Sequence, residues 1–380
     1  TVLLLFLSSG IWVAISMIGV SSIGMILFTS RPVGDAMATT IWGASSSWTL
    51  TALPLFVWMG EILFRTKLSE NLFEGLAPWL QKLPGGLIHV NVVGCALFAA
   101  ISGSSAATVA TVGKMSIPEL RKRKYPEKIL LGSLAGSGTL GLLIPPSIIL
   151  IIYGVTVQES IAKLFIAGII PGIMIALIFM GYVIIWSLLN KNKMPLTDEN
   201  FSFLNKLNKS KQLIPVILLI LGVIGSIYTG IATATEAASL GVVGALILSY
   251  FQKSLNLKTF KESLLGATKT SCMIAFILAG ATFLSLAMGF TGLPRNLAIW
   301  IQNMELSPYV LIFVLMIFYI ILGMFLDGIS AVVLTMAIIE PMIRQAGFDM
   351  IWFGIFLVIV VEMAQITPPV GFNLFVLQGM

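Results

Sequence analysis

The sequence predicts an all-α polytopic membrane protein with an inverted internal repeat, two re-entrant helical hairpins and two helices broken by Pro-Pro pairs. Of its 380 residues, 58% are hydrophobic and only 10% are charged, whereas a soluble domain carries roughly 25% charged residues. So few charges cannot cover a water-facing surface, and we expect lipid to surround most of the chain. Several apolar runs are also close to the ~20 residues that a spanning helix needs. They cover residues 11–28, 164–189, 213–228, 231–251, 271–290 and 309–326.

The internal repeat is indicated by prolines that recur at one fixed separation. Pro118 precedes Pro341 by the same number of residues as the Pro-Pro pair at 145–146 precedes the pair at 368–369. One matched proline is unremarkable, but a matched Pro-Pro pair is much less expected by chance. In membrane proteins built from two such copies, binding sites form at the interface between the copies.

Charge placement predicts that the two copies have opposite orientations. Basic residues favour the cytoplasmic side of a membrane protein. The flanks of the first interrupted run are strongly basic, whereas the matching flanks of the second hold only Arg295 and Arg344. The basic residues of the first flanks are Arg65, Lys67, Lys82, Arg121, Lys122, Arg123, Lys124 and Lys128. We therefore expect the first flanks in the cytoplasm, the second flanks outside, and the lysine-rich connections at 191–211 and 253–261 in the cytoplasm.

Each interrupted run is predicted to form a re-entrant helical hairpin. Residues 87–117 are too long for one comfortable span, and the turn at 102–105 (Ser-Gly-Ser-Ser) interrupts them. Both ends must stay with the basic flanks, so the turn is expected near the middle of the membrane. Residues 313–339 repeat the pattern, with the break near Asp327 and Gly328. Irregular backbone at that depth is tolerated only beside protein or a water-filled cavity, which makes both tips candidate sites.

The two Pro-Pro pairs predict helices that are split into halves beside these tips. Proline lacks an N–H group and clashes with the preceding turn, so each split exposes carbonyl oxygens on one half and N–H groups on the other. Carbonyl and hydroxyl oxygens suit Na⁺, and a helix N-terminus favours an anionic group. Each tip is expected to meet one break, giving two sodium sites beside a substrate cavity. The candidate sodium-binding residues are Ser102, Ser104, Ser105, Gly138, Gly141, Asp327, Ser330, Thr367 and Gly371, and the candidate substrate-binding residues are Ser105, Pro145, Ser147 and Asn373.

Some polar residues in the apolar runs, within and outside this list, have an alternative structural interpretation. The Ser-rich turn is also the composition found where membrane helices pack closely. Asp327 is the only acidic residue between positions 306 and 339, and an intramembrane carboxylate is costly enough to indicate function. Glu362 could line the cavity or pair with a buried base. Glu236 could be functional or could open a helix, where acids favour the first turn.

Several other functions are excluded or weakened. The pair Gly113-Lys114 lacks the earlier glycine of a P-loop, so ATP hydrolysis by this chain is not expected. Cys95 and Cys272 lie in apolar segments, and the single His89 excludes a multi-histidine metal centre. The alternative from another class is an intramembrane serine hydrolase that uses the 102–105 turn with His89. It lacks a further acid–base partner and leaves the duplication unexplained.

Five motifs resemble the large membrane (M) subunit of the TRAP (tripartite ATP-independent periplasmic) transporters. They are LPLFVWMGE at 53–61, AAISGSSAAT at 99–108, GTLGLLIPPS at 138–147, GMFLD at 323–327 and ITPPVGFNLF at 366–375. The resemblance covers nearly the whole chain and implies an inverted-repeat elevator-type transporter, in which a transport domain slides against a scaffold. It also implies sodium coupling, a small membrane (Q) subunit, a periplasmic substrate-binding protein and a bacterial inner-membrane location. The implied substrates are organic acids such as C4-dicarboxylates and sialic acids, and the wording around the Pro-Pro motifs is more similar to the sialic-acid group.

The resemblance also suggests how the chain is divided. We expect a first scaffold and amphipathic arm at 1–85 and the first half of a transport domain at 86–160. A connecting helix with the second scaffold and arm follows at 161–307, and the second transport half at 308–380. The chain departs from the family pattern at Gly328, where many members have proline, and around 230–237, which commonly contains a proline. Family members generally continue with another helix beyond the position of Met380.

Overall fold

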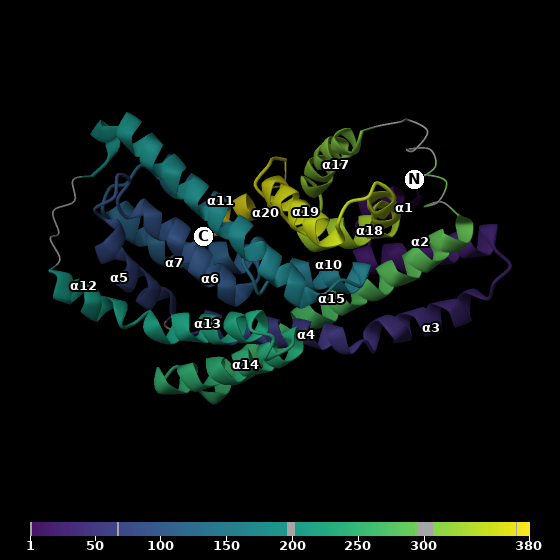
Figure 1. Ribbon diagram of the computed structural model, residues 1–380, viewed down its shortest axis with the longest axis horizontal. Helices are drawn as coiled ribbons and strands as arrows, with labels where there is room; N and C mark the ends of the chain where they lie inside the picture. The colour runs from purple at the N-terminus through teal and green to yellow at the C-terminus, as the bar shows by residue number, and fades with distance from the viewer. Residues whose placement is uncertain are drawn as a thin grey trace.

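The computed structural model describes residues 2–66, 68–195, 202–292, 307–369 and 371–380, together with positions 294, 296 and 299. Throughout this part of the chain the regular structure is helical and contains no strand, which confirms the predicted all-α class (Figure 1). Five segments are long and apolar enough to cross a membrane, and two bent helix pairs raise this to as many as seven within the same residues. The chain is therefore a polytopic membrane protein. Lys67 and Arg295, two of the predicted flanking residues, lie outside the described residues.

The first part of the chain contains short helices and two interrupted helices, one bent before α4 and the other broken before α10. Its helices are α1 (Val2–Ser8), α2 (Val13–Phe28), α3 (Val33–Ser45), η1 (Trp48–Thr51), α4 (Ala52–Phe64), α5 (Leu68–Leu80), α6 (Ile88–Ser102), α7 (Ser105–Lys122), α8 (Glu127–Gly138), α9 (Leu140–Leu143) and α10 (Ile148–Val157). The pair α3 and η1–α4 is bent by 53°. The sequence prediction did not identify it as a span, because the polar stretch at 45–51 interrupts the apolar run.

The second part contains longer helices as well as interrupted ones. Its helices are α11 (Ile161–Leu189), η2 (Lys191–Lys193), α12 (Phe203–Ser210), α13 (Ile214–Tyr228), α14 (Ala234–Phe251), α15 (Leu257–Thr291), α17 (Pro308–Gly323), α18 (Gly328–Gln345), α19 (Met350–Gln365) and α20 (Phe372–Gln378). The predicted run at 271–290 is only part of α15. Asn256 caps α15 by accepting from the Thr259 N–H at 2.8 Å, so Lys258 and Lys261 lie in its first turns and not in a loop.

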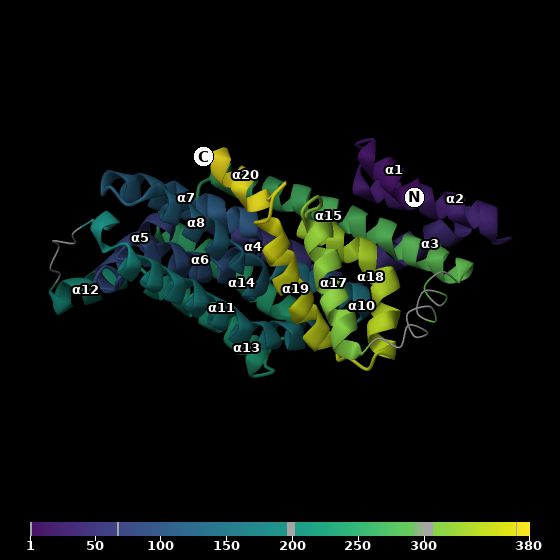
Figure 2. The same cartoon turned by 90° about the horizontal axis from the view of Figure 1, so that it is seen from above.

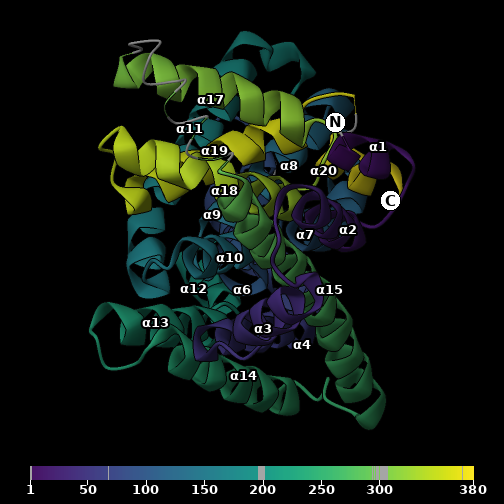
Figure 3. The ribbon, with the colours of Figure 1, turned by 90° about the vertical axis from the view of Figure 1, so that its right-hand side faces the viewer.

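Two groups of helices pack along each other. In one group, α15 packs against α2, α3 and α4, and α14 packs against α4 and α13. In the other, α6, α7 and α8 pack together, and α19 packs against α10, α11, α17 and α18. Figures 1 and 3 show α3, α4, α13 and α14 along one side and α17, α18 and α19 on the opposite side. Helices α15 and α4 join the groups through α18, α6 and α10.

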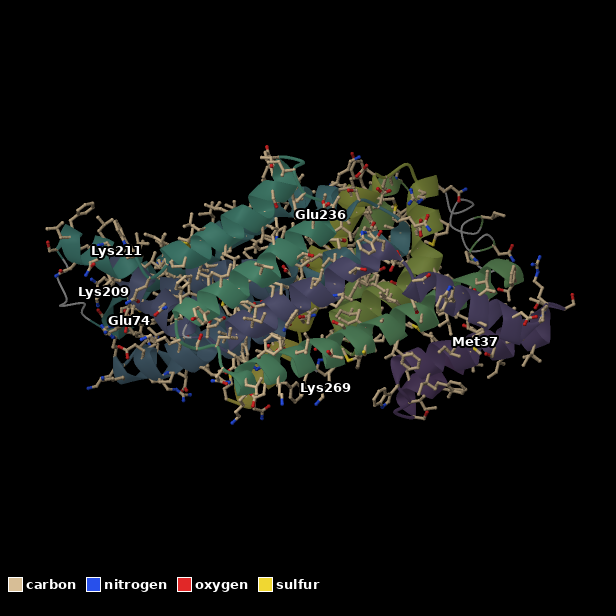
Figure 4. The ribbon with its side chains drawn as sticks, turned by 90° about the horizontal axis from the view of Figure 1, so that it is seen from below. Met37, Glu74, Lys209, Lys211, Glu236 and Lys269 are labelled. Atoms are coloured by element: carbon tan, nitrogen blue, oxygen red, sulfur yellow. The ribbon has the colours of Figure 1, made fainter. Side chains whose placement is uncertain are left out.

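The arm formed by α5 and α12 extends from one end of the molecule. Trp79 of α5 donates its indole N–H to Ser210 of α12 at 2.7 Å, and Gln212 donates to Glu74 at 3.4 Å. Figure 4 shows Glu74, Lys209 and Lys211 gathered at this end, far from Met37 of α3. The Lys206 ammonium lies 5.4 Å from the centroid of the Trp79 ring, which also packs edge-on against Phe203. Amphipathic contacts of this kind are typical of segments at a membrane surface.

Both predicted interruptions are present as hairpins. Helices α6 and α7 pack against each other around the turn at 103–104, and α17 and α18 are joined by residues 324–327. Both Pro-Pro pairs also interrupt helices: the first lies between α9 and α10, and the second between α19 and α20. In the view from above, α10, α17, α18 and α19 stand side by side (Figure 2). The internal repeat, its inverted orientation and the re-entrant path of the hairpins remain predictions from the sequence.

Candidate functional site: two hairpin tips and two helix breaks

The tip of the first hairpin is built from a left-handed glycine followed by a capping serine. Gly103 ends α6 at φ +61°, a conformation that costs glycine little. Ser104 caps α7, and its hydroxyl accepts from the Ala107 N–H at 3.5 Å. Below the tip, the hydroxyls of Ser102 and Thr108 lie 2.9 Å apart, and Thr108 donates to the Ser104 carbonyl at 2.8 Å. Hydroxyl and carbonyl oxygens therefore cluster at this turn.

This tip lies directly against the first Pro-Pro break. The Ile148 N–H, at the start of α10, donates to the Gly103 carbonyl at 3.3 Å. A Cβ placed on Gly141 would lie 2.6 Å from the Ser104 carbonyl oxygen, so only glycine allows this approach. A Cβ placed on Gly138 would lie 2.0 Å from a methyl carbon of Val109 in α7. The contacts bring the candidate residues Ser102, Ser104, Gly138 and Gly141 together in one junction.

The break itself is capped by Ser147. Its hydroxyl donates to the Leu142 carbonyl and accepts from the Leu150 N–H at 3.3 Å. Ser147 is fully buried, and Pro145 contributes to packing against Gly168 of α11. The candidate substrate residues Pro145 and Ser147 therefore hold the break in place, beside the tip that contains Ser105.

The tip of the second hairpin is organised by Asp327. Its carboxylate caps α18 by accepting from the Ser330 N–H at 3.1 Å. Asp327 is exposed, whereas Ser330 is buried. One carboxylate oxygen thus stabilises the helix start, and the other has no partner drawn from the described residues. The carboxylate is available to a cation without leaving its capping position.

The second break is less closely tied to its tip than the first. Thr367, two residues beyond the end of α19, donates to the Met363 carbonyl of that helix at 2.6 Å. Gly371 begins α20 at φ +57°. Among the described residues no hydrogen bond joins Asp327 or Ser330 to Thr367 or Gly371. Asn373 is buried against α8, and its side-chain N–H₂ donates to the Ala135 carbonyl at 3.4 Å.

Two side chains of α19 reach the first half of the chain. Gln365 accepts from the Ser105 hydroxyl at 2.7 Å, and both residues are buried. Glu362, one turn earlier, is 3% exposed and faces the backbone of Leu143 in α9. Its Oε1 has no hydrogen-bond partner, and the structure contains no ion pair between Glu362 and another described residue. The sequence analysis did not identify Gln365 or Thr108 as candidates. The sequence did contain a signal for both: Gln365 lies within one helical turn of the second Pro-Pro pair, and Thr108 lies within one helical turn of the Ser-rich turn.

Glu236 and His89 have structural roles. Glu236 forms a capping box with Thr233 at the start of α14, which agrees with the simpler prediction that it opens a helix. His89 is bonded to the Pro84 carbonyl at 2.9 Å. His89 lies in the first turn of α6 and Ser102 is its last residue, so the two lie about 20 Å apart along the helix at 1.5 Å per residue. This geometry gives no support to a serine hydrolase.

A cavity of about 600 Å³ lies between the two groups of helices, away from both tips. Its walls come from α3, η1, α10, α15 and α18, and none of the predicted site residues lines it. Glu159 and Glu340 on its wall both pair with Arg344, at 3.6 and 2.9 Å. Arg344 also donates to the Val157 carbonyl at 3.1 Å, which ties the end of α18 to the end of α10.

Comparison with known proteins identifies the family. The family model described as "Tripartite ATP-independent periplasmic transporter, DctM component" matches residues 1–380. This chain belongs to that family. The resemblance found in the sequence is thereby confirmed, and the chain is a TRAP large membrane subunit, a transport protein and not an enzyme.

Named relatives of this TRAP subunit differ in their substrates. The C4-dicarboxylate large permease DctM of Pseudomonas aeruginosa is 34% identical over 94% of this chain and 84% of its own length. The isethionate permease DctMQ of Oleidesulfovibrio alaskensis is 32% identical over 99% of this chain and 59% of its own length. The sialic acid large permease SiaM of Vibrio cholerae is 30% identical over 97% and 86%.

A solved structure shares the fold of this subunit. The Neisseria gonorrhoeae MtrF structure, reported as illuminating a class of antimetabolite efflux pumps, superimposes with a TM-score of 0.50. It covers 91% of this chain and 76% of MtrF at 14% sequence identity. At this identity the likeness extends to the fold alone.

Proposed function

We propose that this TRAP large subunit takes up an organic acid in symport with Na⁺, using cation sites at its hairpin tips. The contact between the first tip and the first Pro-Pro break supports this proposal most directly. There the Gly103 carbonyl, the Ser104 carbonyl and the Ser102 and Thr108 hydroxyls lie within hydrogen-bonding distance of one another or of the break. Oxygen-only clusters of this kind suit a hard monovalent cation.

The same junction offers a place for an anion. Helices α7 and α10 both begin there, at Ser105 and Ile148. Helix N-termini carry partial positive charge, which favours a carboxylate. A cation bound at the carbonyls and a carboxylate bound at the N-termini would neutralise each other. This pairing gives a physical reason for sodium and an organic acid to move together.

The second cation site is proposed around Asp327, Ser330, Thr367 and Gly371. Asp327 already stabilises the start of α18 and is exposed. A carboxylate placed at the end of a hydrophobic hairpin is costly, and a bound cation offsets that cost. This site is more open than the first, since no hydrogen bond closes it between the described residues of the tip and the break.

Substrate and partners follow from the relatives. Their names specify C4-dicarboxylate, isethionate and sialic acid, all of them organic acids. We propose a small membrane subunit, a periplasmic binding protein that delivers the acid, and a location in a bacterial inner membrane. The DctMQ relative supports the small (Q) subunit, because its name combines M and Q and its chain extends well beyond the length matched here.

Movement is proposed to follow an elevator mechanism. The helices of the hairpins and breaks would slide as one body against α2–α4 and α13–α15. The cavity of about 600 Å³ between α3–α15 and α10–α18 supports this division, because it separates the two groups along part of their contact.

The test is uptake of labelled acid into proteoliposomes that contain this subunit, its small partner and the matching periplasmic protein. A labelled C4-dicarboxylate and labelled sialic acid are compared, with an inward sodium gradient imposed or replaced by potassium. We expect one acid to accumulate only with the sodium gradient. The proposal is contradicted if no acid shows sodium dependence while the periplasmic protein still binds its ligand.

A further inference from the structure

Helix α19 lies between the second hairpin and the first Pro-Pro break. It packs against α17 and α18 of the second hairpin, and against α9 and α10 at the first break. Gln365 is its last residue and is 4% exposed. A polar amide at this position would be unfavourable in a purely apolar contact, because buried polar groups require partners.

The amide of Gln365 touches both hairpin tips. On one side, Oε1 accepts the hydroxyl hydrogen of Ser105, the first residue of α7. On the other side lies Gly328, the first residue of α18, which directly follows Asp327. A Cβ placed on Gly328 would lie 2.8 Å from Nε2 of Gln365 and 2.7 Å from Val361. The absence of a side chain at position 328 is what lets the amide reach this far.

We propose that Gln365 is a positioning residue that couples the two hairpin tips, so that loosening one tip loosens the other. Ser105 belongs to the first copy, whereas Gln365 and Gly328 belong to the second. If the Ser105 hydroxyl withdraws, Oε1 becomes a buried acceptor without a donor. The amide must then turn to find a partner, and its other end no longer packs on Gly328. Helix α18 consequently loses support next to its Asp327 cap.

This coupling has a consequence for transport that rests on the proposed function. Two cation sites on tips that move together would fill cooperatively, since coupling between sites is reciprocal. The sodium dependence of uptake would therefore be steeper, with a higher Hill coefficient, in the native chain than in the Gln365→Leu variant.

The decisive experiment is hydrogen–deuterium exchange on the purified complex without sodium, which does not depend on the proposed function. Exchange is followed in peptides covering 101–108 and 326–331. The variants are Ser105→Ala, Gln365→Leu, the double variant, and Tyr319→Phe as a matched control. Tyr319 also makes a buried side-chain hydrogen bond, to Thr335 at 2.6 Å, but within the second hairpin alone.

We expect Ser105→Ala to speed exchange at 326–331 by about tenfold, the effect of losing a hydrogen bond worth about 1.4 kcal/mol. In the Gln365→Leu background Ser105→Ala should add nothing further there, and Tyr319→Phe should leave 101–108 unchanged. The inference is overturned if Ser105→Ala changes only 101–108, or if the two substitutions act additively at 326–331.

A second variant protects the test against a folding defect. Gln365→Glu keeps an oxygen acceptor for Ser105, so its exchange at 101–108 should stay close to that of the native chain. Loss of protection in Gln365→Glu equal to that in Gln365→Leu would also overturn the inference. A native complex without any sodium response would contradict the proposed function and would leave the exchange result standing.

Discussion

At the scale of single residues, Asp327 combines two roles that a substitution can separate. Its carboxylate caps α18 through the Ser330 N–H, and asparagine caps helices about as well as aspartate. Asp327→Asn should therefore keep the helix while it removes the charge offered to a cation. A charged ligand contact is worth roughly 1.5–3 kcal/mol, so we expect sodium-driven uptake at limiting sodium to fall by about 10- to 100-fold.

The matched control for this substitution is Asp349→Asn. Asp349 is also exposed and caps α19 in the same way, accepting from the Trp352 N–H at 2.9 Å, but it lies at the opposite end of that helix from the break. Uptake by Asp349→Asn should match that of the native chain. Equal losses in both variants would show that capping, and not charge, explains the effect.

Only some of the residues at the candidate site could be identified from the sequence. The Ser102–Ser105 turn, Asp327 and the Pro-Pro pairs stood out because polar, breaking or charged residues are rare within apolar runs. Gln365 did not, since its importance depends on Ser105, a residue distant in the chain. The same limit applies to Asn373, whose partner Ala135 lies in another helix.

At the scale of elements, the first junction depends on glycine at position 141. A Cβ there would lie 2.6 Å from the Ser104 carbonyl and 2.7 Å from the Thr108 hydroxyl, and backbone cannot easily move aside. Gly141→Ala should separate the tip from the break, destabilise the protein by about 1–3 kcal/mol, and reduce uptake. Thermal unfolding and transport assays measure both effects.

Gly132 provides the comparison on neighbouring α8. A Cβ at Gly132 would meet nothing within 4 Å, so Gly132→Ala should stabilise the helix by as much as about 1 kcal/mol. The account of the junction fails if the two alanine variants have the same stability and uptake.

The boundaries of the helices were harder to predict from the sequence. Helix α15 begins at Leu257 because Asn256 caps it, and a hydropathy pattern does not reveal such a local contact.

At the scale of the whole molecule, the elevator proposal requires the two groups of helices to slide. Ser285 of α15 and Ala337 of α18 line the cavity from opposite groups. Cysteines at both positions, joined by a short reducible cross-linker in a Cys272→Ser background, should stop uptake, and reduction should restore it. Each single-cysteine variant serves as the control. Full uptake by the cross-linked protein would contradict sliding at this interface.

The internal duplication stays a prediction from the matched proline positions, whereas the helix interruptions at the two turns and at the two Pro-Pro pairs are present as expected. The packing of α19 between the second hairpin and the first break could not be predicted, because spacing along the sequence does not indicate which helices are neighbours. Glu362 illustrates this. The sequence analysis left open whether it lines a cavity or pairs with a buried base. In the structure it lies against the backbone of Leu143 and has no basic partner among the described residues.

The most direct test of the account is equilibrium binding of radioactive sodium to the purified complex. We predict saturable binding that unlabelled sodium displaces and potassium does not, with lower stoichiometry in Asp327→Asn and unchanged stoichiometry in Asp349→Asn. Binding that is absent, or that is unaffected by Asp327→Asn and by Gly141→Ala alike, would contradict the assignment of cation sites to the hairpin tips.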